Sequence, residues 1–236
     1  MPDQSSQAIV DDLLTEATRR LIRTTDGLAD EEYAGPSGLP DWTRGHVLAH
    51  LTLNAEGMAG AIGGILEGER TPMYASQEAR DADIAELAVA SPTVIRARLL
   101  GATTDLADAL DAVPDDQWDT TIDRVPGGRT FPAGDLPRMR LQEVEIHHAD
   151  LAAGYSRTDW PAAFPVLLLD GLSMKGVSAD LSFHAHASDL DRTWTFGEGG
   201  PTVTGTAADL GWWLTGRGTG DGLTSDSGSL PQIGTW

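Results

Sequence analysis

The sequence predicts an α+β protein with two domains: a four-helix bundle over residues 1–156 and a smaller α+β domain over residues 157–236. Four segments in the first two thirds of the chain repeat apolar residues at helical spacing. After Tyr155, long helical patterns give way to short alternating segments and glycine-rich turns. The length of 236 residues also suits two small domains.

Capping signals help to place the helices of the first domain. Ser91 followed by Pro92 is a helix cap followed by proline at the first helical position, and Asp41 or Thr43 can cap the second helix. The predicted helices cover about residues 6–29, 44–67, 91–112 and 134–154, with short helical turns in the connection 69–90 and a turn or short hairpin over 127–135.

The second domain combines helical and strand-like patterns. Residues 162–181 form an amphipathic pattern that predicts a helix, and residues 207–217 predict another. Between them, "SFHAHASD" and "RTWTFGEGGPTVTGT" alternate as strands do, with "GEGGP" as a turn between two strand-like halves. This mixture predicts a small sheet with helices.

The charge balance argues against two classes of partner. Sixteen basic and 36 acidic residues give a formal charge of −20, and such a surface repels phosphate backbones and anionic lipid. We therefore expect no nucleic acid and no membrane partner. No apolar run approaches the roughly 18 residues of a membrane span, and the N-terminal residues lack the pattern of a signal peptide, which favours a cytoplasmic protein.

The chain contains no cysteine. This excludes disulfides, thiolate metal sites and a cysteine nucleophile. Any metal must be bound by His, Asp or Glu, and any thiol chemistry must use a thiol from outside the protein.

Polar residues interrupt the apolar stripe of the last bundle helix. Glu143 and His147 are one turn apart on the face that also carries Leu136 and Ile146. On the second helix, His50 lies closer to the apolar face than His46 does. Two histidines and one glutamate form a common catalytic zinc set with an open position, and facing bundle helices are a usual place for one.

Simpler interpretations exist for each of these residues. H-x-x-x-H and E-x-x-x-H patterns are common, and a single buried histidine is usually only hydrogen-bonded. Glu143 could form a structural ion pair with Arg140, which lies on the same face. Asp150 could orient His147 as an outer partner of a metal ligand, or be an ordinary acid at a helix end.

Four segments together resemble a known family, the mycothiol-dependent maleylpyruvate isomerases. They are "LPDWTRGHVLAHLTLNAEGM", "TPMYASQEARDADIA", "RMRLQEVEIHHADL" and "WWLTGRGTGDGLTSDSGSLP", in order along nearly the whole chain. The resemblance implies a DinB-like metal-binding bundle followed by a domain similar to sterol-carrier-protein folds. It implies zinc ligands at His50, Glu143 and His147, in agreement with the helical-face argument, and an essential arginine at Arg217.

The same resemblance implies a reaction. Mycothiol would add to the cis double bond of maleylpyruvate, the resulting single bond would rotate, and elimination would leave fumarylpyruvate and the regenerated thiol. The substrate is a dianion, so cations must orient it. Arg217 is the main candidate, and Arg80 and Arg140 are further ones; a surface ion pair is the simpler interpretation of each. We expect the second domain to contribute to this site and the protein to be a monomer.

Two other functions fit parts of the pattern. A mycothiol S-transferase or another thiol-dependent detoxifying enzyme would share the zinc ligands and the thiol but not the dianion site. A non-catalytic module could instead bind an apolar ligand between Trp194, Trp212 and Trp213, although tryptophans at such positions more often belong to a core.

Overall fold

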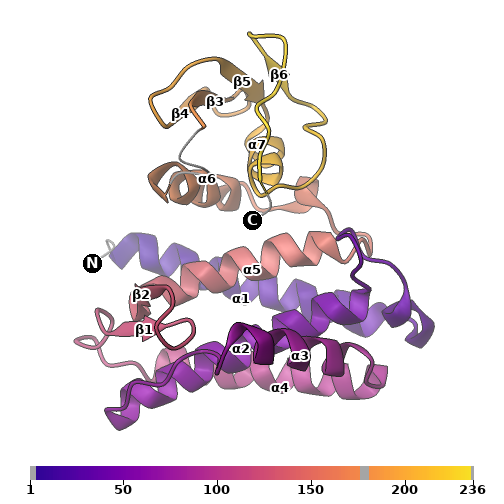
Figure 1. The fold of residues 1–236 in the computed structure, drawn as a ribbon, viewed down its shortest axis with the longest axis vertical. Helices are drawn as coiled ribbons and strands as arrows, with labels where there is room; N and C mark the ends of the chain where they lie inside the picture. Colours follow the sequence, from indigo (N-terminus) through magenta and orange to yellow (C-terminus); the bar gives the residue numbers. More distant parts are fainter. Residues whose placement is uncertain (1–3, 176–180, 235–236) are drawn as a thin grey trace. The chain divides into compact units, whose positions relative to one another are not determined.

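The structure is a computed structural model that describes residues 4–175 and 181–234. The chain divides into two compact units, Met1–Gly154 and Tyr155–Trp236. The predicted α+β class is confirmed, since the first unit is built from helices with one short hairpin and the second contains a four-stranded sheet (Figure 1).

Long helices form the first unit. They are α1 (Gln4–Gly27), α2 (Arg44–Glu67), α4 (Pro92–Asp111) and α5 (Leu136–Asp150), with the short 3-10 helices η1 (Asp30–Ala34) and η2 (Ala133–Asp135) between them. Helix α2 packs against α4 and α5, and α1 packs against α5. Side chains cap the starts of two of these helices. The Thr43 hydroxyl accepts a hydrogen bond from the His46 amide at the start of α2, and the Ser91 hydroxyl accepts one from the Val94 amide at the start of α4.

The connection after α2 differs from the prediction. It contains a continuous helix, α3 (Gln77–Ala88), where the sequence suggested only short turns. The Ser76 side chain caps this helix through the amide of Ala79, and Ile84 and Leu87 are buried on the side that packs against α2. A third of the helix is alanine, so its apolar stripe is narrow, which is why the periodicity was weak in the sequence.

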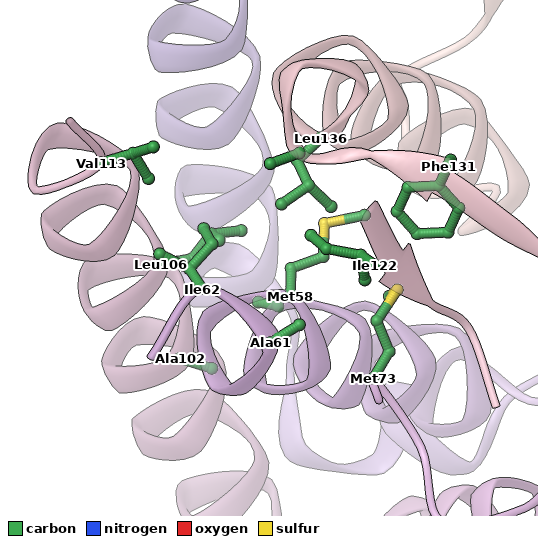
Figure 2. Close-up of a cluster of buried hydrophobic side chains, with 12 residues drawn as sticks. Met58, Ala61, Ile62, Met73, Ala102, Leu106, Val113, Ile122, Phe131 and Leu136 are labelled. Atoms are coloured by element: carbon green, nitrogen blue, oxygen red, sulfur yellow. The ribbon is translucent and has the colours of Figure 1, made fainter. Parts of the chain in front are cut away.

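A small hairpin packs beside the bundle. Strands β1 (Thr121–Asp123) and β2 (Thr130–Pro132) pair antiparallel, with Ile122 opposite Phe131. These two side chains enter a buried cluster with Met58 and Ile62 of α2 and Leu136 of α5 (Figure 2). The sequence predicted a turn or short hairpin over residues 127–135, whereas the observed hairpin spans residues 121–132 and residues 133–135 form η2.

The loop after α2 runs along this hairpin. The amides of Met73 and Tyr74 donate to the carbonyls of Asp123 and Arg124, at 2.9 and 3.1 Å. On its other side the loop approaches α2 at Gly57, where an added Cβ would lie only 2.8 Å from the Met73 carbonyl oxygen. Backbone contacts on both sides thus fix the position of Tyr74.

The second unit has its own core. Helix α6 (Ala163–Lys175) follows η3 (Arg157–Asp159), and the sheet is formed by β3 (Phe183–Ala187), β4 (Arg192–Phe196), β5 (Thr202–Gly205) and β6 (Thr224–Ser225), with α7 (Ala207–Leu214) between the last two. The order is β4-β3-β5-β6, so β3 separates the two halves that we expected around the "GEGGP" turn, and β3 pairs parallel with β5. Residues 176–180 of the helix predicted over 162–181 lie outside the described residues.

Two of the three tryptophans named from the sequence belong to this core, as the simpler interpretation expects, whereas Trp212 is half-buried and its ring packs against Trp160. Trp194 and Trp213 are each 5% exposed and pack with Phe183 and Phe196. In the described part of the chain, no helix is both long enough and apolar enough to span a bilayer.

Candidate metal centre

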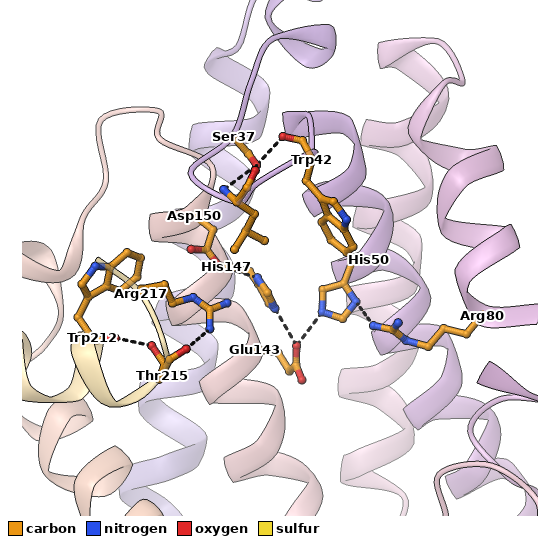
Figure 3. A network of polar contacts seen from close by, with 11 residues as sticks. Ser37, Trp42, His50, Arg80, Glu143, His147, Asp150, Trp212, Thr215 and Arg217 are labelled. Atoms are coloured by element: carbon orange, nitrogen blue, oxygen red, sulfur yellow. Dashed lines mark hydrogen bonds and ion pairs between the residues drawn. The ribbon is translucent and has the colours of Figure 1, made fainter. Parts of the chain in front are cut away.

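Three ligand-type side chains from two helices meet in the first unit. The four-residue spacing places Glu143 and His147 on one face of α5, and His50 reaches them from α2 (Figure 3). The Glu143 Oε2 atom lies 2.8 Å from His50 Nε2 and 3.3 Å from His147 Nε2. One ligand atom of each residue lies within 4.8 Å of the others.

His46, the other histidine of α2, has a different role. Its Nδ1 lies 2.7 Å from the Thr43 hydroxyl and 3.3 Å from the Thr43 amide, so it belongs to the capping interactions of the helix. Helical geometry therefore separates the two histidines of "HVLAH" as the sequence predicted: His50 joins the cluster and His46 does not.

Asp150 holds the ring of His147. Its Oδ2 atom lies 2.9 Å from His147 Nδ1, and both side chains are buried. With Nδ1 donating to this carboxylate, Nε2 is the nitrogen that can act as a ligand, and it is the one that faces Glu143. The structure thus places Asp150 where an orienting residue would be.

The end of α5 is held by the loop that precedes α2 and by Arg44, the first residue of α2. The Gly38 amide donates to the Asp150 carbonyl at 2.7 Å. The Arg44 guanidinium donates to the carbonyls of Leu151 and Ala152 at 2.9 and 3.1 Å. These bonds end α5 at Asp150, before the Gly154 that the sequence suggested, because they satisfy carbonyls that a longer helix would bond internally.

Burial and close contact shift the protonation of the cluster. Burial, with the charge of His147 nearby, lowers the pKa of His50 to about 4. Burial would also lower the pKa of His147, but hydrogen bonds with Asp150 and Glu143 raise it. Burial would raise the pKa of Glu143, but the hydrogen bonds with His147 and His50 hold it well below its usual range. Glu143 is therefore a carboxylate and His50 a neutral imidazole at neutral pH.

This donor set fits a divalent metal. Imidazole nitrogens and a carboxylate oxygen are the ligands of catalytic zinc sites with three protein ligands. Both histidines are buried, whereas the Glu143 side chain keeps 20% of its surface exposed, so the cluster is reachable from solvent. The three ligand atoms lie close together, and the Asp150 carboxylate is hydrogen-bonded to the other ring nitrogen of His147.

The arginines named from the sequence lie in different surroundings. Arg80 Nη2 lies 2.9 Å from His50 Nδ1, and its Nη1 pairs with the exposed Asp81. Arg140 is 1% exposed and forms no ion pair with Glu143 or any other described carboxylate, so the structural ion pair that we considered for it is not present. Arg217 belongs to the second unit, where its Nη1 donates to the Thr215 carbonyl at 2.8 Å.

Two residues near the cluster, Asn54 and Tyr74, were not predicted from the sequence. Asn54 follows His50 by one helical turn and accepts a hydrogen bond from Arg140 Nη1 at 2.7 Å. Tyr74 lies under the Arg80 guanidinium, whose Cζ is 5.6 Å from the ring centroid. The spacing of Asn54 from His50 could have indicated it, whereas Tyr74 lies on a loop, where no periodicity signals which way a side chain points.

A helical bundle whose two-histidine, one-glutamate cluster could hold a metal ion, followed by a small α+β unit, is the architecture expected of a metal-binding bundle protein. The family described as the mycothiol maleylpyruvate isomerase N-terminal domain matches residues 14–152, more than half of the chain. The chain belongs to this family, and the predicted resemblance is confirmed.

Two solved structures are similar to this protein over nearly the whole chain. A crystal structure of the mycothiol-dependent maleylpyruvate isomerase superposes with a TM-score of 0.88 at 28% sequence identity, covering 98% of this chain and 97% of that one. A histidine-to-alanine variant of that enzyme superposes with a TM-score of 0.87 at the same identity and coverage. Among curated protein sequences, none matches this chain.

Proposed function

We propose that this protein is a zinc- and mycothiol-dependent isomerase that converts maleylpyruvate into fumarylpyruvate. The observation that carries the proposal is the convergence of His50, Glu143 and His147 within a fold similar to that isomerase over 98% of the chain. The absence of cysteine supports a thiol supplied as a cofactor.

His50, Glu143 and His147 would hold the metal, and Asp150 would keep His147 in the tautomer that presents Nε2. When bound, zinc supplies a positive centre that favours the thiolate form of a thiol at neutral pH. The protein contributes two neutral imidazole donors and one carboxylate, so the metal keeps a net positive charge that favours a further anionic ligand.

When bound, mycothiol supplies the thiolate that adds to the cis double bond of the substrate and is released after the bond has rotated. The chain must bind and orient the dianionic substrate. Arg217 would do so with its planar pair of N–H donors, which match a carboxylate better than a lysine does, and Arg80 and Arg140 would add positive charge in the first unit.

The finer features of the proposal follow the sequence. The metal-binding bundle would extend over residues 1–156 and the second domain over residues 157–236. We propose a cytoplasmic monomer whose partners are small molecules. Burial of Trp194 and Trp213 within a core weighs against the rival in which this unit is an apolar ligand-binding module.

The test is an ultraviolet assay of maleylpyruvate conversion with dialysed, zinc-loaded protein. We expect conversion only when mycothiol is added, with the thiol recovered unchanged at the end. The Glu143→Gln variant should lose activity together with metal, while His46→Ala should keep both, because His46 belongs to the helix cap. Full turnover without any thiol would contradict the mechanism, and steady consumption of mycothiol into a conjugate would favour the S-transferase.

A further inference from the structure

Arg140 is a buried cation that forms no ion pair with any carboxylate in the described part of the chain. Its side chain is 1% exposed, and its Nη1 donates to the Leu51 carbonyl at 2.8 Å and to Asn54 Oδ1 at 2.7 Å. Its Nη2 is buried and has no hydrogen-bond partner among the residues that the structure describes. Burial lowers the pKa of Arg140 to about 10, so the guanidinium remains charged at neutral pH.

Such a group is costly in a folded protein. A buried donor left unpaired loses its hydration without replacement, and a buried charge needs an opposite charge nearby. Glu143, one turn further along α5, contributes favourably to the charge of Arg140, but its Oε2 faces the two histidines. The position therefore makes physical sense if an anion approaches Arg140 during function.

Arg80 repeats this pattern from α3. Its Nη1 and Nη2 are engaged by Asp81 and His50, but its Nε is buried and has no partner among the described residues. Tyr74 lies near both cations: the Arg80 guanidinium lies over its ring, and Asn54, which accepts from Arg140, is also close to Tyr74. Two unpaired N–H donors thus come from two helices next to the metal cluster.

We propose that Arg140 and Arg80, with the Tyr74 hydroxyl nearby, form an anion subsite in the first unit that binds one carboxylate group of the substrate beside the metal. Asn54 holds Arg140 in place through Nη1 and leaves Nη2 for the ligand. The inference rests on the proposed function for the identity of the substrate, but the subsite is defined by carboxylate chemistry alone.

The charges around the metal cluster favour an anionic ligand. Counting a divalent metal as +2, with Arg80 and Arg140 positive and Glu143, Asp150 and the Asp81 that pairs with Arg80 negative, the cluster has an excess of one positive charge. A protein with a formal charge of −20 has few reasons to gather positive charge at one place other than to bind anions.

The test is calorimetric titration of the full chain with maleate, a cis dicarboxylate, in the absence of any thiol. Arg140→Gln and Arg80→Gln should each weaken maleate binding roughly tenfold or more, because each removes a charged donor. Arg98→Gln is the matched control, since Arg98 pairs with Glu56 at 2.7 Å on the surface; it should bind maleate as the unchanged protein does.

A second variant guards against simple misfolding. Asn54→Asp places a carboxylate next to Arg140 Nη1, so it should hold the unfolding temperature while neutralising the subsite and weakening maleate binding roughly tenfold. A purely structural Arg140 would leave maleate binding unchanged in this variant.

Two outcomes would overturn the proposal. One is unchanged maleate affinity in folded Arg140→Gln and Asn54→Asp proteins. The other is binding that disappears on metal removal yet is indifferent to both arginines, which would assign the carboxylate to the metal alone. Because the titration contains no thiol and no turnover, a protein that binds maleate through the arginines but fails to isomerise maleylpyruvate would reject the proposed function and keep the subsite.

Discussion

Replacing Asp150 by asparagine tests whether the carboxylate behind His147 tunes a metal ligand. The two side chains have nearly the same shape, so Asp150→Asn keeps a hydrogen-bond acceptor 2.9 Å from His147 Nδ1 and removes only the charge. The pair is buried, with side chains 8% and 1% exposed, so solvent screens it little.

The expected loss follows from the kind of hydrogen bond. A bond to a charged partner contributes about 1.5–3 kcal/mol and a neutral one about 0.5–1.5 kcal/mol, so the variant should lose roughly 1–2 kcal/mol of metal binding. That corresponds to a zinc Kd weaker by roughly 5- to 30-fold, which overlaps the range of about 10- to 100-fold that is usual for outer partners of metal ligands.

The assay is competition for zinc with a chromophoric chelator, run beside Asp83→Asn as a control for loss of one negative charge at an exposed position on α3. Circular dichroism and thermal unfolding without metal should show that Asp150→Asn remains folded. A zinc affinity equal to that of Asp83→Asn would refute the reasoning and leave Asp150 with only a structural role at the end of α5.

Three further predictions concern the same residues. His50→Ala and His147→Ala should lose bound metal, while His46→Ala and His148→Ala should retain about one equivalent by elemental analysis, because these two side chains bond to Thr43 and Thr24 instead. Since burial depresses the pKa of His50 to about 4, below its unfolded value of about 6.5, the metal-stripped protein should be fully stabilised by this group above pH 6.5 and lose that contribution as the pH falls toward 4; urea unfolding of His50→Ala should show a flatter acid limb. Arg217→Ala should lower kcat/KM roughly 100-fold with unchanged zinc content, and Arg217→Lys should restore little of it in the same steady-state assay.

Helical periodicity was enough to predict much of this arrangement. The angular positions of Glu143 and His147 on α5, and of His50 rather than His46 on α2, are properties of single helices, and the structure brings these three together. The caps at Thr43 and Ser91 were likewise local. The direction of a side chain on a helix and the cap of that helix depend on residues close together in the chain, so both can be predicted from one sequence.

Long-range pairings were beyond the same reasoning. Nothing in the "GEGGP" segment shows that β3, earlier in the chain, separates β4 from β5, because strand order depends on which faces can be buried together. The contact of Arg80 with His50 spans 30 residues and arises only because α3 is a full helix packed on α2. Pattern and propensity do not carry such information.

The hydrogen bonds at the end of α5 affect how fast a metal ion bound by His50, Glu143 and His147 would be released. An ordinary helix end frays, and its last turn opens at almost no free-energy cost. Here the carbonyls of Asp150, Leu151 and Ala152 accept hydrogen bonds from Gly38 and Arg44, so we expect the end of α5 to open only when these bonds break too. We therefore expect the two segments, more than 100 residues apart in the chain, to open together, so that their amides share one rate of hydrogen exchange. A metal held there would leave on that slow timescale, which gives the centre kinetic persistence as well as affinity.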